Sequence, residues 1–267
     1  MTETINIWCG EAELYADARP APPSILLDIC TQLVHTPQPI LVVDLGSGTG
    51  LSTVIWAEHA RQVIGIEPNA DMRFQAAQHA AAFPRAERVR YQDGLSTRTG
   101  LPSDCADMVT CSQSLHWMEP EPTFAEVVRI LKPGGLFAAY DYDWPPTVHW
   151  EVEQVYHEVI ARFRKIRAER EVDRDVKSWS KDKHLARMQD SGCFRYVKEL
   201  VVHHTEEGNA ERFIRLTLSY GIARYLKQGY LTEQEVGLDH LKRVAQDLIG
   251  PESIPWYFSY RVRIGIK

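Results

Sequence analysis

The sequence predicts an α/β protein in which a parallel sheet is covered by helices on both faces. Between residues 40 and 142, short apolar runs that are typical of buried strands alternate with segments of helical character. Glycine, proline and asparagine mark the breaks between these segments, as expected for the turns of such a fold. The length of 267 residues, with 44% hydrophobic and 25% charged residues, is sufficient for one large domain.

The first part of the chain contains a regular series of expected strands and helices. The run ILVVDLG opens the series, and Asn69 and Asp71 are suited to begin the helix after the second strand. Pro133 and the two glycines after it are expected to end the last helix of this part. Strands are predicted at residues 40–46, 62–68, 88–93, 106–112 and 136–142, and helices at residues 51–60, 69–83 and 121–135.

A helical, charge-rich stretch without strand character follows at residues 151–190, and we expect it to lie over the sheet as an insertion. Alternation of strands and helices then resumes, and the last run, WYFSYRVRIGI, alternates well enough for a half-buried strand. The remaining elements are expected as strands at residues 194–205 and 256–266 and as helices at residues 209–226 and 232–249.

The composition disfavours a polyanionic partner. The formal net charge is −6, and the basic cluster RFRKIR at residues 162–167 lies among acidic residues, as is usual for a solvated helix face. The N-terminus lacks the basic and apolar regions of an export signal, and no segment approaches the ~18 apolar residues that a membrane-spanning helix needs. We therefore expect no nucleic-acid partner and no membrane insertion.

The five cysteines are odd in number and scattered, without a C-x-x-C pair. This arrangement indicates neither a disulfide framework nor a zinc site, so we interpret the cysteines as reduced thiols of a cytoplasmic protein. His203 and His204 have no cysteine or carboxylate partner at ligand spacing, which argues against a metal site at this position.

The stretch DLGSGTG, residues 44–50, follows the first expected strand. In an open parallel sheet the ligand crevice lies beyond the carboxyl ends of the strands, and the loop after the first strand usually lines it. Gly46, Gly48 and Gly50 permit tight turning and close approach to a ligand, and the positive end of the following helix favours a carboxylate or a phosphate. A tight turn without a ligand remains the alternative, because short glycine motifs have a high false-positive risk.

Two acidic residues end the next strands in the same layer. Glu67, at the end of the second strand, is placed to accept hydrogen bonds from both hydroxyls of a ribose. Asp93, followed by Gly94, ends the third strand, and its ionised carboxylate could accept a hydrogen bond from the amino group of a purine ring.

Five motifs in order resemble those of the class I S-adenosylmethionine-dependent methyltransferases. They are DLGSGTG, Glu67, QDG at 92–94, SQSLHWM at 112–118 and LKPGG at 131–135. The most similar subgroup, methyltransferase type 11, includes the menaquinone and ubiquinone C-methyltransferases and the trans-aconitate methyltransferases. The likeness covers residues 13–142 motif by motif and residues 194–267 only by the order of strands and helices. It implies a Rossmann-like, doubly wound sheet of seven strands in the order 3-2-1-4-5-7-6, with the last strand antiparallel.

The resemblance also implies a single domain, residues 1–267, with four parts. Residues 1–35 would cover the cofactor, and residues 36–142 would form the cofactor-binding core. Residues 143–193 would form a helical substrate lid inserted after strand 5, and residues 194–267 would supply strands 6 and 7 with their helices.

The implied cofactor is S-adenosyl-L-methionine, with S-adenosyl-L-homocysteine as the product. YADARP at residues 15–20 resembles the segment that closes over this cofactor, where the guanidinium of Arg19 would fork onto the cofactor carboxylate. Arg19 as a surface residue and Met72 as a core residue remain alternatives. The implied cofactor-binding residues are Tyr15, Arg19, Asp44, Gly46, Ser47, Gly48, Glu67, Pro68, Met72, Asp93, Gly94, Ser112 and Gln113.

Methyl transfer from a sulfonium is an in-line displacement, so the protein must align the reactants and exclude water. His116, which follows the fourth strand, is the candidate general base, with positioning or packing as the alternative. The aromatic residues Trp117, Tyr140 and Trp144 are candidates to bind the methyl acceptor, although each could equally be a packing residue. We expect a small, partly apolar acceptor, no metal, and a monomer or homodimer.

Two other functions remain open. An NAD(P)-dependent oxidoreductase also uses a glycine loop and an acidic residue after the second strand, but in its G-x-G-x-x-G motif the third glycine comes one residue later than Gly50. That function would also leave LKPGG without a role. A protein that binds S-adenosylmethionine without catalysis would show the same cofactor-binding residues.

Overall fold

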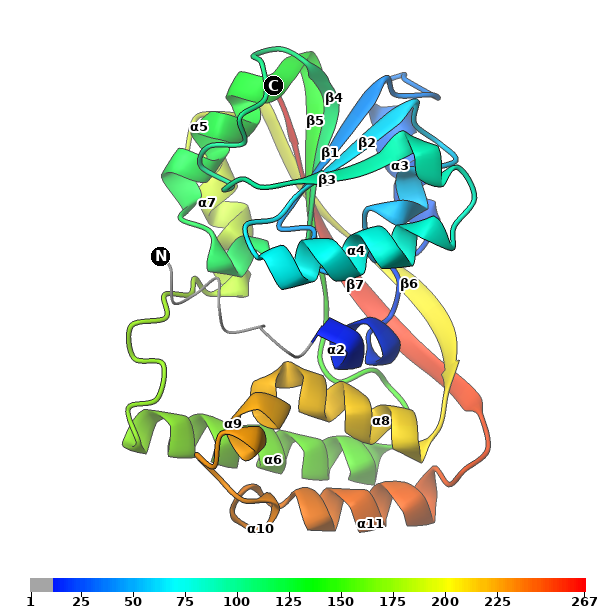
Figure 1. Ribbon diagram of the computed structural model, residues 1–267, viewed down its shortest axis with the longest axis vertical. Coiled ribbons are helices and arrows are strands. Elements are labelled where there is room, and N and C mark those ends of the chain that lie inside the picture. The colour runs from blue at the N-terminus through cyan, green and yellow to red at the C-terminus, as the bar shows by residue number, and fades with distance from the viewer. Residues whose placement is uncertain (1–11) are drawn as a thin grey trace.

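Seven strands form one sheet in the order β3-β2-β1-β4-β5-β7-β6, and β7 runs antiparallel to both of its neighbours (Figure 1). The predicted strand order is confirmed. The computed structural model describes residues 12–267, so residues 1–11 of the expected covering segment, Cys9 included, lie outside the described residues. The strands are β1 (Leu41–Leu45), β2 (Gln62–Ile66), β3 (Val89–Gln92), β4 (Ala106–Ser112), β5 (Leu131–Tyr142), β6 (Tyr196–Gly208) and β7 (Ile254–Ile266).

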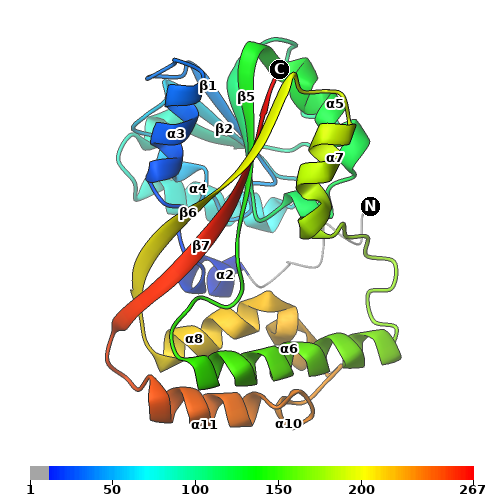
Figure 2. The same ribbon diagram turned by 180° about the vertical axis from the view of Figure 1, so that it is seen from behind.

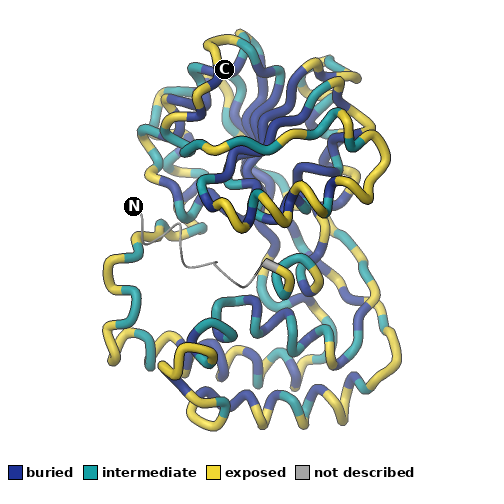
Figure 3. Tube along the Cα trace, viewed as in Figure 1, coloured by how far each residue is buried: buried dark blue, intermediate teal, exposed yellow. Residues whose placement is uncertain are grey.

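Helices pack on both faces of the sheet. They are α3 (Ile25–Leu33), α4 (Ala70–Ala81), α5 (Pro120–Ile130) and α7 (His184–Asp190). Val42, Met108 and Leu136 stand in register on neighbouring strands and share one hydrophobic core with α3, whereas the residues that follow each of them share a second core with α5 and α7. Strands covered on both faces have continuous apolar runs, and the whole of β1 is accordingly buried (Figure 3).

The prediction of a helix at residues 51–60 is wrong. This segment consists of consecutive turns around a short 3₁₀ helix, η1 (Val54–Trp56), and most of its backbone hydrogen bonds span three residues. The hydroxyls of Ser52 and Thr53 donate to the buried carboxylate of Asp44, which ties the start of the segment to β1. Polar side chains that bond elsewhere and β-branched residues both weaken an α-helix, so the segment that follows the glycine loop presents no α-helical N-terminus to it.

The other two helices predicted before residue 143 are confirmed, with one changed boundary. α4 begins where expected, since the side-chain oxygen of Asn69 accepts a hydrogen bond from the backbone N–H of Met72 at 3.0 Å. α5 ends at Ile130, earlier than predicted, and β5 begins at Leu131, so LKPGG belongs to the strand. Pro133 disfavours helical backbone in the residue before it, which agrees with this early end.

A second, helical layer lies beyond the sheet, and β6 and β7 reach it as one long antiparallel strand pair (Figure 2). The far half of this strand pair packs Trp256 and Phe258 into this layer, where the ring of Phe213 lies edge-on to Trp256. The helical layer and one face of the sheet therefore share a continuous hydrophobic core. Its helices are α6 (Trp150–Glu169), α8 (Ala210–Thr217), α9 (Ala223–Lys227), α10 (Glu233–Val236) and α11 (Leu238–Leu248).

The structure divides the region predicted as a lid, residues 143–193, between the two layers. α6 packs against α10 and α11 in the helical layer, whereas α7 packs against β6 and β7 beside the sheet. The connection between them, residues 170–183, contains only turns, irregular chain and the 3₁₀ helix η4 (Lys181–Lys183), and we call it the strap. The helices after β6 complete the helical layer. A lid built from this layer would therefore contain α6 together with α8 to α11, and not residues 143–193 alone.

Within residues 12–267, no helix combines the length and the apolar character needed to cross a membrane. The cysteines in this part of the chain, Cys30, Cys105, Cys111 and Cys193, are free thiols. Burial raises the pKa of Cys30 to about 12, which keeps this thiol protonated and unreactive at neutral pH.

Candidate functional site

A cavity of about 270 Å³ lies at the carboxyl ends of the parallel strands, where the sequence predicts the ligand crevice. The loops after β1, β2, β3 and β4 line it, together with helix α2 (Ala12–Ala18) and the strap. The structure brings together at this cavity the predicted residues Tyr15, Arg19, Gly46, Ser47, Gly48, Glu67, Pro68, Met72, Gly94, Ser112, Gln113 and Trp117.

The glycine loop after β1 turns tightly beside the cavity. The backbone N–H groups of Gly46 and Ser47 both donate to the carbonyl of Ile66 at the end of β2, at 2.8 and 3.2 Å. Gly46 and Gly48 have φ angles of 62° and 53°, which glycine adopts without strain. A Cβ at Gly46 would lie 2.7 Å from the methyl carbon of Met118, whereas a Cβ at Gly48 would meet no protein atom within 4 Å. Gly48 therefore borders open space.

Glu67 lies directly after β2, and both of its carboxylate oxygens accept hydrogen bonds from backbone N–H groups. Its Oε2 accepts a hydrogen bond from the N–H of Gly48 at 3.0 Å, and its Oε1 accepts one from the N–H of Asn69 at 2.9 Å. Burial raises its pKa above the usual value and outweighs the lowering by these N–H groups and by Arg73. Each oxygen keeps a further lone pair, so the carboxylate can also accept hydrogen bonds from hydroxyl groups of a ligand.

Asp44, predicted to bind the cofactor, does not line the cavity. It is fully buried, and its carboxylate accepts hydrogen bonds from the hydroxyls of Ser52 at 2.6 Å, Thr53 at 2.7 Å and Thr110 at 2.9 Å. Burial raises its pKa, although the three hydroxyls act in the opposite direction. The contribution of Asp44 is to hold the chain on both sides of the glycine loop.

Asp93, predicted to face an adenine amino group, also lies outside the cavity. Its side chain is 74% exposed and forms an ion pair with Arg73 at 3.1 Å. The loop that follows β3 does reach the cavity, through Gly94, Ser96 and Thr97. The side chain of Asp93 therefore points to solvent, whereas the residues that follow it line the cavity.

Arg19 joins α2 to the helical layer at the edge of the cavity. Its guanidinium donates to the hydroxyl of Tyr15 at 2.7 Å and to the backbone carbonyl of Ser219 at 2.8 Å. It also lies over the ring of Tyr15, 3.8 Å from the ring centre, with the ring of Trp144 at 5.2 Å. These contacts hold α2 in place at the edge of the cavity.

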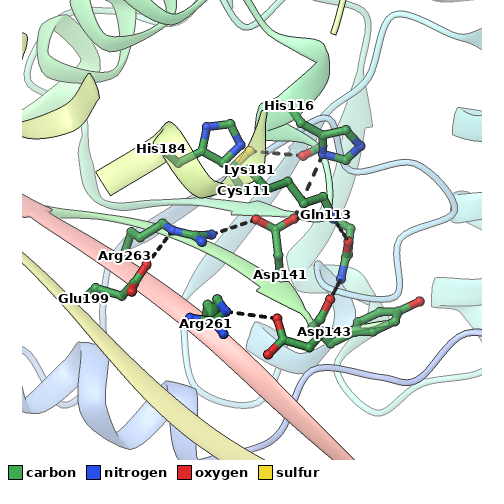
Figure 4. A network of polar contacts seen from close by, with 12 residues as sticks. Cys111, Gln113, His116, Asp141, Asp143, Lys181, His184, Glu199, Arg261 and Arg263 are labelled. Carbon is green, nitrogen blue, oxygen red and sulfur yellow. Dashed lines mark hydrogen bonds and ion pairs between the residues drawn. The ribbon is translucent and has the colours of Figure 1, made fainter. Parts of the chain in front are cut away.

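Gln113 lies between the cavity and a network of charged side chains. It follows β4 with a φ of 51°, which is uncommon for a residue other than glycine. Its Oε1 accepts a hydrogen bond from the Nζ of Lys181 in the strap at 2.5 Å, and this ammonium lies 2.9 Å from Oδ1 of Asp141 on β5 (Figure 4). The strap is thus fastened to the sheet beside the cavity.

His116, the candidate general base, does not line the cavity. Its Nδ1 lies 4.0 Å from Oδ1 of Asp141, on the side of the charged network (Figure 4). Burial, followed by the nearby ammonium of Lys181, holds the pKa of His116 well below its usual range, so the ring is neutral at neutral pH. The neighbouring Trp117 does line the cavity.

Two of the three aromatic residues predicted to bind the acceptor also lie outside the cavity. Tyr140 is buried in the core of the sheet, and Trp144 packs against the rings of Tyr142 and Tyr156. Both were expected near the site because they end or follow β5, but Tyr140 lies two residues before the end of this strand, where its ring belongs to the core beside the cavity-lining Tyr142. Tyr142 and Trp179 supply aromatic surface to the cavity instead.

Sequence reasoning missed cavity residues of two kinds. Ser114 and Met118 lie within the motif SQSLHWM, so their position after a strand was a usable signal, and the hydroxyl of Ser114 donates to the carbonyl of Leu45 at 2.9 Å. Tyr260 on β7 and Lys177 in the strap carried no such signal, because only tertiary packing brings them to the cavity.

Among residues 12–267, no group of three or more histidine, cysteine, aspartate or glutamate side chains is arranged to hold a metal ion. Nε2 of His204 lies 3.2 Å from a carboxylate oxygen of Glu206, and Nδ1 of His203 lies 3.2 Å from the hydroxyl of Ser259. The two histidines thus make polar contacts within the antiparallel β6–β7 pair.

Residues 43–139, which include the glycine loop and Glu67, match the family described as "Methyltransferase domain". An uncharacterized methyltransferase-like protein of Schizosaccharomyces pombe is 28% identical over 62% of this chain and 62% of its own. The probable S-adenosylmethionine-dependent methyltransferase CRG1 of Saccharomyces cerevisiae is 28% identical over 55% of this chain and 51% of its own. The chain thus spans between half and two thirds of the length of these relatives.

A solved structure extends the likeness of fold to nearly the whole chain. The structure of a putative type II methyltransferase from Anaeromyxobacter dehalogenans aligns over 93% of this chain and 97% of its own, with a TM-score of 0.65. The sequence identity in this alignment is 19%, so it supports the fold alone and carries no information about the substrate.

Proposed function

We propose that this protein, whose residues 43–139 match a methyltransferase domain, is a class I methyltransferase that transfers the methyl group of S-adenosyl-L-methionine to a small-molecule acceptor. The observation that carries the proposal is the junction of Gly48 and Glu67. An open backbone position and a buried carboxylate, joined by a hydrogen bond, adjoin the same cavity there. An amino acid linked to a ribose has the groups that these two features can bind.

The residues around the cavity fit this cofactor. A Cβ at Gly48 would extend into open space, so the glycine loop can receive the methionine part against its backbone. Glu67 would accept hydrogen bonds from the ribose hydroxyls, and Pro68 and Met72 would pack on the adenine ring. When bound, the cofactor supplies a methyl group activated by a sulfonium.

The chain's own part in the reaction is to align the acceptor and to exclude water. Trp117, Tyr142 and Trp179 place aromatic surface on the cavity, which suits a partly apolar acceptor. Aromatic faces also stabilise a nearby cation by about 0.5–2 kcal/mol, depending on desolvation.

Calorimetry with S-adenosylhomocysteine and with NAD tests the proposal against the oxidoreductase alternative. We expect binding of S-adenosylhomocysteine and no binding of NAD, and the reverse result would refute the proposal. Transfer of labelled methyl to a panel of carboxylic acids, phenols, quinones and amines then separates an enzyme from a binding protein. Binding of S-adenosylhomocysteine without transfer to any class in the panel would favour the non-catalytic alternative.

The raised pKa of Glu67 predicts that cofactor binding weakens in mild acid. Protonation takes away part of the carboxylate's capacity to accept hydrogen bonds, so affinity should fall as the pH approaches a pKa that lies above the usual value. Calorimetry with S-adenosylhomocysteine from about pH 8 to about pH 5 measures this decline. Glu67→Gln should bind more weakly throughout and lack the decline, and an equal decline in both proteins would assign it to another group.

His116→Gln is expected to change the rate of methyl transfer by less than about threefold, because the neutral ring faces Asp141 from outside the cavity. Initial rates with an acceptor found in the panel measure the effect. A loss of about a hundredfold, the usual scale of general-base catalysis, would instead support His116 as the base.

A further inference from the structure

Charged side chains from β5, β6, β7 and the strap form one network beside the cavity (Figure 4). At its centre, Oδ2 of the buried Asp141 lies 2.9 Å from Nη1 of Arg263, and Oδ1 lies 2.9 Å from Nζ of Lys181. Arg263 is also buried and binds Glu199 at 2.9 Å. Burial raises the pKa of Asp141, but the neighbouring cations, Lys181 first, outweigh it and hold this pKa below the usual range.

Arg263 and Lys181 hold Asp141 from different parts of the molecule. Arg263 stands on β7 between β5 and β6, so the sheet itself supplies one counter-charge to Asp141. Lys181 comes from the strap, and its ammonium also donates to Oε1 of Gln113 at 2.5 Å. Because Gln113 lines the cavity, Lys181 connects the strap to the cavity wall.

The strap is fastened near both of its ends. At its start, the carboxylate of Asp173 binds the guanidinium of Arg224 on α9 in the helical layer. Near its end, the backbone N–H of Trp179 donates to the carbonyl of His116 at 2.8 Å, and the side chain of Trp179 lines the cavity. The position of the strap therefore determines part of the cavity's shape.

We propose that Lys181 is a positioning residue of the cofactor site, which holds the side chain of Gln113 in place and keeps the strap closed over the cavity. The proposal rests on the proposed function, since it concerns the same cavity. An ammonium group suits the role because its three donors can serve Asp141 and Gln113 together. Without Lys181, Asp141 would keep Arg263, whereas Gln113 would lose this bond.

Lys181→Met removes the charge and keeps most of the stem. We expect this variant to bind S-adenosylhomocysteine about tenfold more weakly in calorimetry, the scale of one lost charge-assisted hydrogen bond. Hydrogen exchange at the backbone N–H of Trp179 should accelerate by about the same factor, because the strap would open more often. Lys181→Arg keeps the charge and should stay within about threefold of the wild type in both measurements. Lys183→Met, at an exposed position of the same strap, is the matched control and should change neither.

A double-mutant cycle with Gln113→Met separates positioning from a general effect on folding. If Lys181 acts through Gln113, the losses in affinity for S-adenosylhomocysteine should overlap, and the double variant should bind little more weakly than Gln113→Met alone. Fully additive losses would overturn the proposal, as would unchanged affinity or unchanged exchange at Trp179 in Lys181→Met. The exchange measurement needs no ligand, so it tests the strap even if the wild type fails to bind S-adenosylhomocysteine, a result that would refute the proposed function itself.

Discussion

Gly48→Val is expected to abolish binding of S-adenosylhomocysteine, with a loss of affinity of about a hundredfold or more in calorimetry. A Cβ at this position would meet no protein atom within 4 Å, so the valine side chain would extend into the space that the cofactor requires. The substitution would also strain the backbone, because Gly48 has a φ of 53°. Strain alone would lower the stability of the protein, whereas occupation of the cavity would remove binding.

Gly192→Val is the matched control for this substitution. Gly192 has a φ of 65°, and a Cβ there would also meet no protein atom within 4 Å, but it lies in an exposed turn between α7 and β6. Both variants should lose about 1–2 kcal/mol of unfolding free energy, measured in urea, and only Gly48→Val should lose binding. If Gly48→Val binds like the wild type, the glycine loop does not contact the cofactor.

Glu67→Ala is expected to weaken binding of S-adenosylhomocysteine by about 1–3 kcal/mol, or roughly 5- to 150-fold. The ribose hydroxyls would lose their hydrogen-bond acceptor, and the N–H groups of Gly48 and Asn69 would lose the partner that orders the loop. Calorimetry measures the affinity, and unfolding in urea shows that the variant still folds.

Asp93→Ala is the comparison for Glu67→Ala, since both residues are acidic and follow adjacent strands. The side chain of Asp93 is 74% exposed and outside the cavity, so its removal should change the affinity by less than about twofold. Unchanged affinity in Glu67→Ala would exclude the ribose role. An equal loss in both variants would support the adenine contact that the sequence suggests for Asp93.

Local sequence predicts the sheet well and the segment after the glycine loop poorly. The central strands β1 and β4 follow from apolar runs that are buried on both faces, and the start of α4 follows from the side chain of Asn69. The pattern of residues 51–60 is helical, yet Ser52 and Thr53 bond to Asp44 instead. That competition depends on a carboxylate buried by the whole fold, which no local pattern reveals.

The sequence likewise places some residues of the candidate site correctly and others not. Residues at the carboxyl ends of parallel strands could be placed from the sequence because those ends meet at one edge, as Gly48 and Glu67 do. Asp93 ends a strand too, but nothing in its spacing shows whether its side chain turns to the cavity or to Arg73. Lys181 reaches Gln113 only through the path of the strap, which depends on packing between distant segments.

The antiparallel β6–β7 pair connects the sheet to the helical layer, so the stability of one layer depends on the other. Its strands carry Val262 within the sheet and Trp256 within the helical layer, along one uninterrupted ladder of hydrogen bonds. The helical layer cannot separate from the sheet unless this ladder bends or breaks, so the two layers form one cooperative unit. Access to the cavity then depends on the shorter elements at its rim, α2 and the strap, and exchange of ligands should not require the layers to part.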